Sequence, residues 1–125
     1  MITRILLVED NPNNTRLIEQ IIEDIDDSIE LIEASDGETA IRLAQEGNFH
    51  LVLMDISLPD MDGITITKKI KELANFKDTP FIAVTAYAME QDKDNFREVF
   101  NDYISKPIDD EVFTEKVKKW TNREK

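Results

Sequence analysis

The sequence contains no cysteine, which excludes disulfide bonds, zinc sites built on cysteine and any thiol chemistry. This absence also agrees with a reducing compartment. No apolar run is long enough to form the core of a signal peptide or to span a membrane. We therefore expect a cytoplasmic protein that does not insert into a membrane.

Basic residues are also scarce, with 15 Lys and Arg against 27 Asp and Glu, for a formal net charge of −12. A domain this anionic repels nucleic acid and anionic lipid, so we expect no direct nucleic-acid binding. The length of 125 residues is typical of one domain. A chain of this size buries roughly two-thirds of its unfolded surface, which is enough for a core without metal or disulfides.

Short apolar runs alternate with amphipathic stretches along the whole chain. The runs predict buried strands, and apolar residues at helical spacing predict helices between them. We expect strands at residues 4–8, 28–34, 49–54, 81–84 and 103–104. Five helices are predicted between and after these strands, two of them at about 62–73 and about 89–100. The predicted inner faces of the other three and of the helix at 62–73 are, in chain order, Leu17, Ile18, Ile21, Ile22 and Ile25; Ala40, Ile41 and Ala44; Ile66, Ile70 and Leu73; and Val112, Phe113, Val117 and Trp120.

Five strands that alternate with five helices predict an α/β fold with a parallel sheet covered on both faces. Because crossovers between parallel strands are right-handed, a doubly wound three-layer (βα)5 sandwich is the expected architecture. In such folds, ligands bind beyond the carboxyl ends of the strands. The residues predicted at that edge are polar: Glu9 and Asp10, Asp55, Thr85 and Lys106.

These five side chains together suit phosphoryl transfer. Carboxylates brought close together repel one another, and a bound cation relieves that repulsion. Because the cluster offers oxygen ligands without His or Cys, a hard ion is favoured, and Mg²⁺ is the expected one. Lys106 adds a compact positive charge for a phosphoryl oxygen, Thr85 adds a hydroxyl donor, and Asp55 can act as a nucleophile that forms an acyl phosphate.

Four motifs carry a family resemblance: LLVEDNPNN, LVLMDISLPDMDG, VTAYAM and DYISKPI. In this order and at these intervals, the sequence resembles the CheY-like receiver domain of bacterial response regulators. The first and third motifs look most like receivers of hybrid histidine kinases and phosphorelays. The resemblance covers residues 1–125 as one response regulatory domain with no output domain, and it implies the flavodoxin-like strand order 2-1-3-4-5.

The resemblance also implies a role for individual residues. Asp55 would be the phosphoacceptor. Asp10 would bind Mg²⁺ directly and Glu9 through water, with the Ser57 backbone carbonyl as a further ligand. In the same site, Mn²⁺ could substitute for Mg²⁺.

Other residues would respond to phosphorylation. Thr85 would contact the phosphoryl group, Lys106 would pair with its oxygens, and the Lys106–Pro107 bond would be cis. Tyr103 would be the switch aromatic that changes rotamer, although an ordinary half-buried strand residue would look the same in sequence.

The implied partners are a histidine kinase or histidine phosphotransfer protein as donor, and an unknown downstream protein. The downstream protein would bind the face formed by the fourth helix, fifth strand and fifth helix. Many relatives end the fourth helix with Gly before DYISKP, whereas this chain has Val99, so we expect a different helix end. We expect a monomer or weak dimer, and no enzyme activity beyond self-phosphorylation from small donors and autodephosphorylation.

Three alternatives remain at this point. The receiver could pass its phosphoryl group on as a phosphorelay carrier instead of acting as an output switch. A Mg²⁺-dependent phosphatase with an aspartyl-phosphate intermediate would typically have a second Asp where this chain has Ser57. A flavodoxin would need a phosphate-cradling loop after the first strand, but that loop holds Glu9 and Asp10 and none of the three glycines.

Overall fold

The computed structural model describes residues 2–56, 63–85 and 99–121. Five strands form one parallel sheet in the order β2-β1-β3-β4-β5, which confirms the predicted topology. Their bounds are β1 Arg4–Val8, β2 Glu30–Ala34, β3 Leu51–Asp55, β4 Phe81–Thr85 and β5 Asp102–Ser105. The described helices are α1 Pro12–Ile25, α2 Gly37–Glu46, α3 Gly63–Lys71, the 3-10 turn η1 Ala74–Phe76 and α5 Asp110–Trp120.

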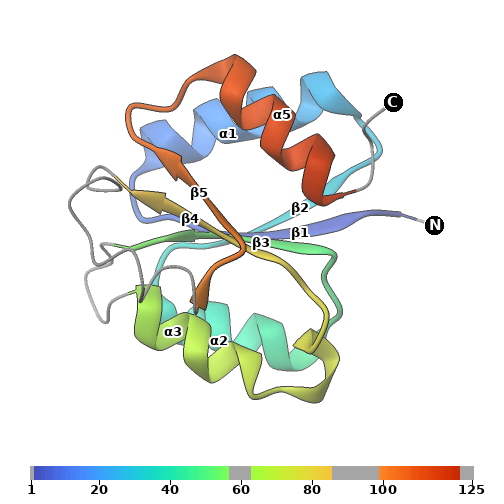
Figure 1. Cartoon of the computed structure of the whole chain (residues 1–125), viewed down its shortest axis with the longest axis vertical. Coiled ribbons are helices and arrows are strands. Elements are labelled where there is room, and N and C mark those ends of the chain that lie inside the picture. Colours follow the sequence, from blue (N-terminus) through green and yellow to red (C-terminus); the bar gives the residue numbers. More distant parts are fainter. Residues whose placement is uncertain (1, 57–62, 86–98, 122–125) are drawn as a thin grey trace.

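The helices cover the sheet on both faces (Figure 1). α1 and α5 pack on one face and α2 and α3 on the other. Each face has its own apolar cluster, one containing Phe49, Phe76 and Phe81 and the other containing Ile18, Phe113 and Val117. All five strands run in the same direction, so their carboxyl ends lie at one edge of the sheet.

Capping residues fix three of the helix starts. The side chain of Asn11 accepts a hydrogen bond from the Asn13 amide, and Pro12 occupies the first turn of α1. The side chains of Asp36 and Asp109 do the same for α2 and α5, accepting from the amides of Thr39 and Val112. Because Asn11 caps α1 directly after β1, the loop that carries Glu9 and Asp10 is short and well defined.

The structure corrects several predicted details. Leu17 and Val112 were predicted to face inward, but each is 41% exposed. Successive helical residues are about 100° apart, so Ile18 and Phe113 take the inward positions and turn their neighbours toward solvent. The second strand begins at Glu30, two residues later than predicted. The preceding residues form a turn, in which the Asp26 carboxylate accepts hydrogen bonds from the amide and the hydroxyl of Ser28.

Other boundaries differ by a few residues. β3 begins at Leu51 and includes Asp55, so the carboxylate ends the strand instead of following it. α3 ends at Lys71, and the chain continues into η1.

The predicted helix at about 89–100 lies largely outside the described residues. At residue 99, the Lys71 ammonium donates a hydrogen bond to the Val99 carbonyl. Lysine thus supplies a partner for a terminal carbonyl at a helix end without Gly.

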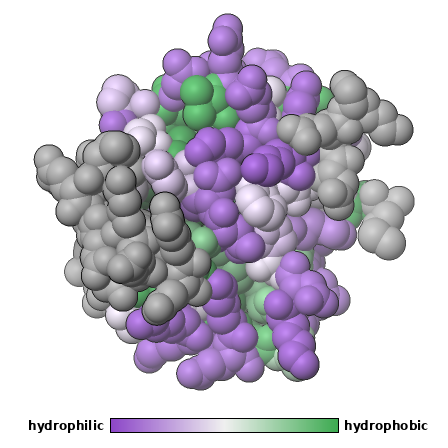
Figure 2. Space-filling view, in the orientation of Figure 1, coloured by the Kyte–Doolittle hydropathy of each residue, from purple (hydrophilic) through white to green (hydrophobic). Residues whose placement is uncertain are grey.

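Hydrophilic residues predominate among the coloured residues of Figure 2, with small hydrophobic patches between them. None of the helices in the described ranges is long and apolar enough to cross a membrane.

Candidate functional site at the carboxyl edge of the sheet

Three carboxylates meet at the carboxyl edge of the sheet. Glu9 and Asp10 directly follow β1, and Asp55 ends the neighbouring strand β3. Each of the three can offer one oxygen, and these atoms all lie within 4.8 Å of one another. Asp55 is only 2% exposed and Glu9 4%, whereas Asp10 is open to solvent. The strand pairing therefore assembles the acidic cluster that the sequence predicts.

Lys106 supplies the positive charge of this cluster. Its Nζ lies 3.3 Å from Glu9 Oε1 and 3.4 Å from Asp55 Oδ2. The Lys106 amide donates to the Thr85 carbonyl at 2.9 Å, which ties the end of β5 to the end of β4. The Lys106–Pro107 bond is cis, as the family resemblance implies. The lysine thus bridges two carboxylates that come from different strands.

The two oxygens of Glu9 have different surroundings. Oε2 accepts a hydrogen bond from the Asn11 amide at 3.1 Å. Oε1 is buried and accepts no hydrogen bond within the described part of the chain, although Lys106 lies nearby. A buried carboxylate oxygen without a hydrogen-bond donor, beside two further carboxylates, fits a divalent cation or water bound to one. The donor set consists of oxygen atoms alone, which suits Mg²⁺.

Thr85 completes the buried part of the site. It ends β4, is 2% exposed and pairs in register with Ser105, the residue before Lys106. Thr85 therefore lies at the edge where Asp55 and Lys106 meet. Ser57, whose carbonyl was predicted as a metal ligand, lies outside the described residues.

Comparison with known proteins agrees with this geometry. The family model of the response regulator receiver domain matches residues 5–118. The chain belongs to the response regulator receiver domain family. This assignment confirms the family resemblance on which the sequence-based roles depend.

Individual relatives include both long and short proteins. The receiver is 41% identical over 108 residues to the signal transduction histidine-protein kinase BarA of Escherichia coli, covering 86% of this chain but 12% of BarA. It is 38% identical over 121 residues to the polar-differentiation response regulator DivK of Brucella abortus, covering 96% and 97% of the two chains. The receiver therefore spans a small part of the kinase but nearly all of DivK.

A solved structure shows the same architecture with a metal in place. The receiver domain of the sensor histidine kinase PA1611 from Pseudomonas aeruginosa superposes with a TM-score of 0.86 at 32% identity, covering 98% of this chain and 99% of that one. That protein was crystallised with a magnesium ion coordinated in its active-site cleft.

Tyr103 lies on the surface of the receiver and is 42% exposed. Its ring packs 4.9 Å from Lys116 Nζ, and its carbonyl accepts a hydrogen bond from the same ammonium. Lys116 also pairs with Asp102 at 2.9 Å, and Asp102 in turn accepts from the Trp120 indole. Sequence reasoning missed this network, because nothing in the local pattern joins the start of β5 to the end of α5.

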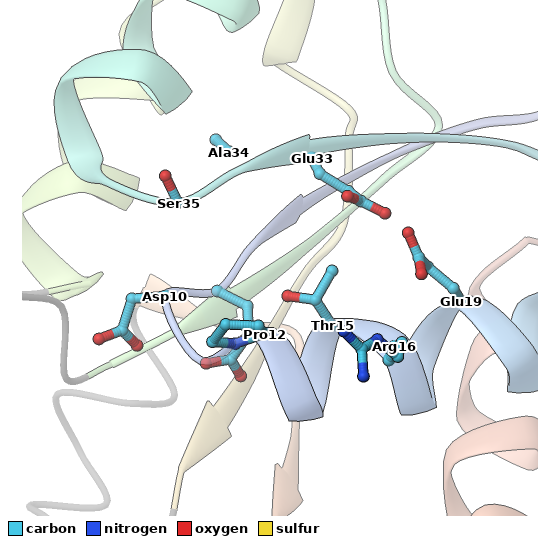
Figure 3. Close-up of a pocket in the computed structure, with 9 residues that line it drawn as sticks. Asp10, Pro12, Thr15, Arg16, Glu19, Glu33, Ala34 and Ser35 are labelled. Atoms are coloured by element: carbon cyan, nitrogen blue, oxygen red, sulfur yellow. The ribbon is translucent and has the colours of Figure 1, made fainter.

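A second acidic feature lies beside the site, in a groove of about 420 Å³ between α1 and β2. Figure 3 shows the carboxyl groups of Glu19 and Glu33 pointing toward one another across this groove. Burial, the hydrogen bond with Glu19 and the charge of Glu19 raise the pKa of Glu33 to about 7. The sequence gives no signal for this pair, because Glu19 and Glu33 approach each other only once α1 packs against the sheet.

Proposed function

We propose that this receiver accepts a phosphoryl group on Asp55 from a phosphohistidine of a histidine kinase or histidine phosphotransfer protein. The observation that carries the proposal is the position of the Asp55 carboxylate. It is buried, belongs to a cluster of three carboxylates and lies 3.4 Å from the Lys106 ammonium. Membership of the receiver family and the similarity to a histidine kinase support it.

In this proposal, a carboxylate oxygen of Asp55 attacks the phosphorus, and a P–O bond forms as the P–N bond to the donor imidazole breaks. The electron pair of the broken bond stays on the imidazole nitrogen, which takes up a proton. Lys106 pairs with an oxygen of the transferred group and offsets its charge. Hydrolysis by water would then release inorganic phosphate and restore the carboxylate.

Glu9, Asp10 and Asp55 would hold the cation, and the Ser57 carbonyl would complete the protein ligands. Mg²⁺ bound there would neutralise charge on the phosphoryl oxygens during transfer. The carboxylates of Glu9 and Asp55 hold Lys106 in the site before a phosphoryl group arrives. Mn²⁺, which takes similar oxygen ligands, would be expected to substitute.

Phosphorylation would act as a switch through Thr85 and Tyr103. The Thr85 hydroxyl would move to the phosphoryl group, and the exposed Tyr103 ring would turn inward, shifting the balance between two surface conformations. The changed surface is the face formed by β5, α5 and the predicted fourth helix. A downstream protein would bind there, because a domain with a net charge of −12 is a poor ligand for nucleic acid.

In this proposal, the chain works in the cytoplasm as a phospho-accepting signalling domain and not as an enzyme acting on a metabolite. Similarity to part of a histidine kinase favours a second role, in which Asp55 passes the group on to another histidine protein. Mixing the phosphorylated receiver with a histidine phosphotransfer protein of the source organism distinguishes the two roles. Rapid movement of the label to the second protein would identify a carrier.

Intact-mass measurement after incubation with acetyl phosphate tests the phosphoacceptor directly. We expect the wild type to gain one phosphoryl group only with Mg²⁺ present, and Asp55→Asn to gain none. Asp78→Asn, which removes an exposed carboxylate before β4, is the matched control and should behave as the wild type. A gain that persists in Asp55→Asn would show that another residue is the nucleophile.

A further inference from the structure

The first residue of α3 lies directly against the backbone of Asp55. A Cβ atom built on Gly63 would stand 2.5 Å from the Asp55 carbonyl oxygen, 2.8 Å from the Ile56 Cα and 3.1 Å from the Asp55 carbonyl carbon. All three contacts are with backbone, which cannot rotate away as a side chain can. A side chain at this position is therefore excluded unless the end of β3 moves.

Residue 63 is glycine because a side chain has no room there, and not because the backbone needs a conformation that only glycine adopts. Among the described residues, no glycine has a positive φ, so the Gly63 backbone lies in a region open to any residue. Its amide donates to the Ile56 carbonyl at 2.9 Å, and the Ile56 amide donates to the Val84 carbonyl at 3.3 Å. The peptide after Asp55 is thus held between the start of α3 and the end of β4.

We infer that Gly63 is a positioning residue for the Asp55 carboxylate. The start of α3 forms a backbone support against which the end of β3 rests. That support sets the distance of the carboxylate from Lys106 and from the other two acids. This inference rests on the proposed function, since it assigns Gly63 a part in the reaction of Asp55.

The size of the required movement sets the expected effect. To bring the nearest contact out to 3.0 Å, the Asp55 carbonyl and the added methyl group must separate by about 0.5 Å. Productive geometry must be held to within about 0.5 Å, so this movement reaches the limit, and a misplacement of about 1 Å can cost roughly a hundredfold in rate. We therefore expect Gly63→Ala to slow phosphorylation by about 10- to 100-fold at saturating Mg²⁺.

Gly47→Ala is the matched control. A Cβ at Gly47 would meet the Arg4 guanidinium at 2.9 Å, but this is the far end of a flexible side chain that can move. Gly47 follows α2, away from the acidic cluster. Both variants add one methyl group to a glycine next to a helix end, but only Gly63→Ala acts on the backbone of Asp55.

The experiment measures the rate of phosphorylation by acetyl phosphate against Mg²⁺ concentration for the wild type, both glycine variants and Asp55→Asn. Circular dichroism at the assay temperature establishes that each protein is folded. Amide NMR spectra locate the perturbation without reference to activity. We expect the Asp55, Ile56 and Lys106 signals to shift in Gly63→Ala and to stay in place in Gly47→Ala.

A slowed but folded Gly63→Ala, with Gly47→Ala within twofold of the wild type, supports the inference. A folded Gly63→Ala that reacts at the wild-type rate overturns it. If Gly63→Ala unfolds, the assay is repeated in trimethylamine N-oxide, which favours compact states. Failure to fold even there assigns the glycine to folding alone and also overturns the inference. Phosphorylation that persists in Asp55→Asn would instead overturn the proposed function.

Discussion

Replacing Lys116 by Met should destabilise the receiver and release its proposed switch residue. The Lys116 ammonium lies 2.9 Å from Asp102 Oδ1, 2.5 Å from the Tyr103 carbonyl oxygen and 4.9 Å from the centre of the Tyr103 ring. Methionine keeps the length and apolar stem of lysine but removes the charge and the donors. The variant therefore isolates the polar contacts of one side chain.

The expected loss follows from these contacts. A hydrogen bond to a charged group contributes about 1.5–3 kcal/mol, and a cation–π contact at an exposed site about 0.5–1 kcal/mol. Because the Lys116 and Asp102 side chains are 27% and 18% exposed, solvent weakens both, and we take a total near the lower end, about 2 kcal/mol. For a chain of this length, that corresponds to a fall in melting temperature of roughly 8 °C.

The loss should also depend on pH. Burial of Asp102 acts to raise its pKa, but hydrogen bonds from Trp120, Lys116 and the Tyr103 amide, with the charge of Lys116, lower it below 3.8. A carboxyl group with a lowered pKa contributes stability that is fully present above 3.8 and is lost as the pH falls through its folded value. The difference between wild type and variant should therefore be complete at neutral pH and shrink in strong acid.

Thermal unfolding followed by circular dichroism measures the effect, with Lys118→Met as a control for the loss of one α5 lysine. Combining Lys116→Met with Asp102→Asn closes a double-mutant cycle. Additive effects in the cycle, or a melting temperature unchanged by Lys116→Met, would refute the reasoning. In Lys116→Met, the NMR signals of the Tyr103 ring should shift, because the exposed ring loses the ammonium group that packs against it.

Two further predictions test features outside this network. Because the pKa of Glu33 is raised from 4.5 to about 7, the stability it contributes is fully present below 4.5 and is lost as the pH rises through about 7. Glu33→Gln should remove this pH dependence, a change of about 0.5 kcal/mol for an exposed pair. Urea unfolding at pH 5 and pH 8 measures the free energy of unfolding of both proteins. An equal difference between the two pH values in wild type and variant would contradict the pairing of Glu33 with Glu19. Phe76 is buried between Phe49 and Phe81 at ring distances of 6.0 and 6.2 Å, so Phe76→Ala should cost about 3–5 kcal/mol, and a loss below about 1 kcal/mol in urea unfolding would be inconsistent with that packing.

The sequence determined the order of strands and helices and the edge at which polar residues collect. The apolar runs at residues 5–8 and 81–84 are buried in full, because a strand covered on both faces needs apolar side chains along its length. The positions of Glu9, Asp10, Asp55, Thr85 and Lys106 at one edge then follow from parallel pairing alone. The strand order itself came from the family resemblance, since alternation permits other orders.

Tertiary structure decided which atoms meet. The spacing of Leu17 and Val112 permits an inward position, and only the packing of each helix against the sheet turned both residues toward solvent. The pairing of Lys116 with Asp102, the approach of Glu33 to Glu19 and the contact of Gly63 with the Asp55 carbonyl were likewise not apparent from the pattern. Periodicity reports the environment of each residue along its own element, whereas distances between elements depend on register, crossover and packing, which are properties of the whole chain.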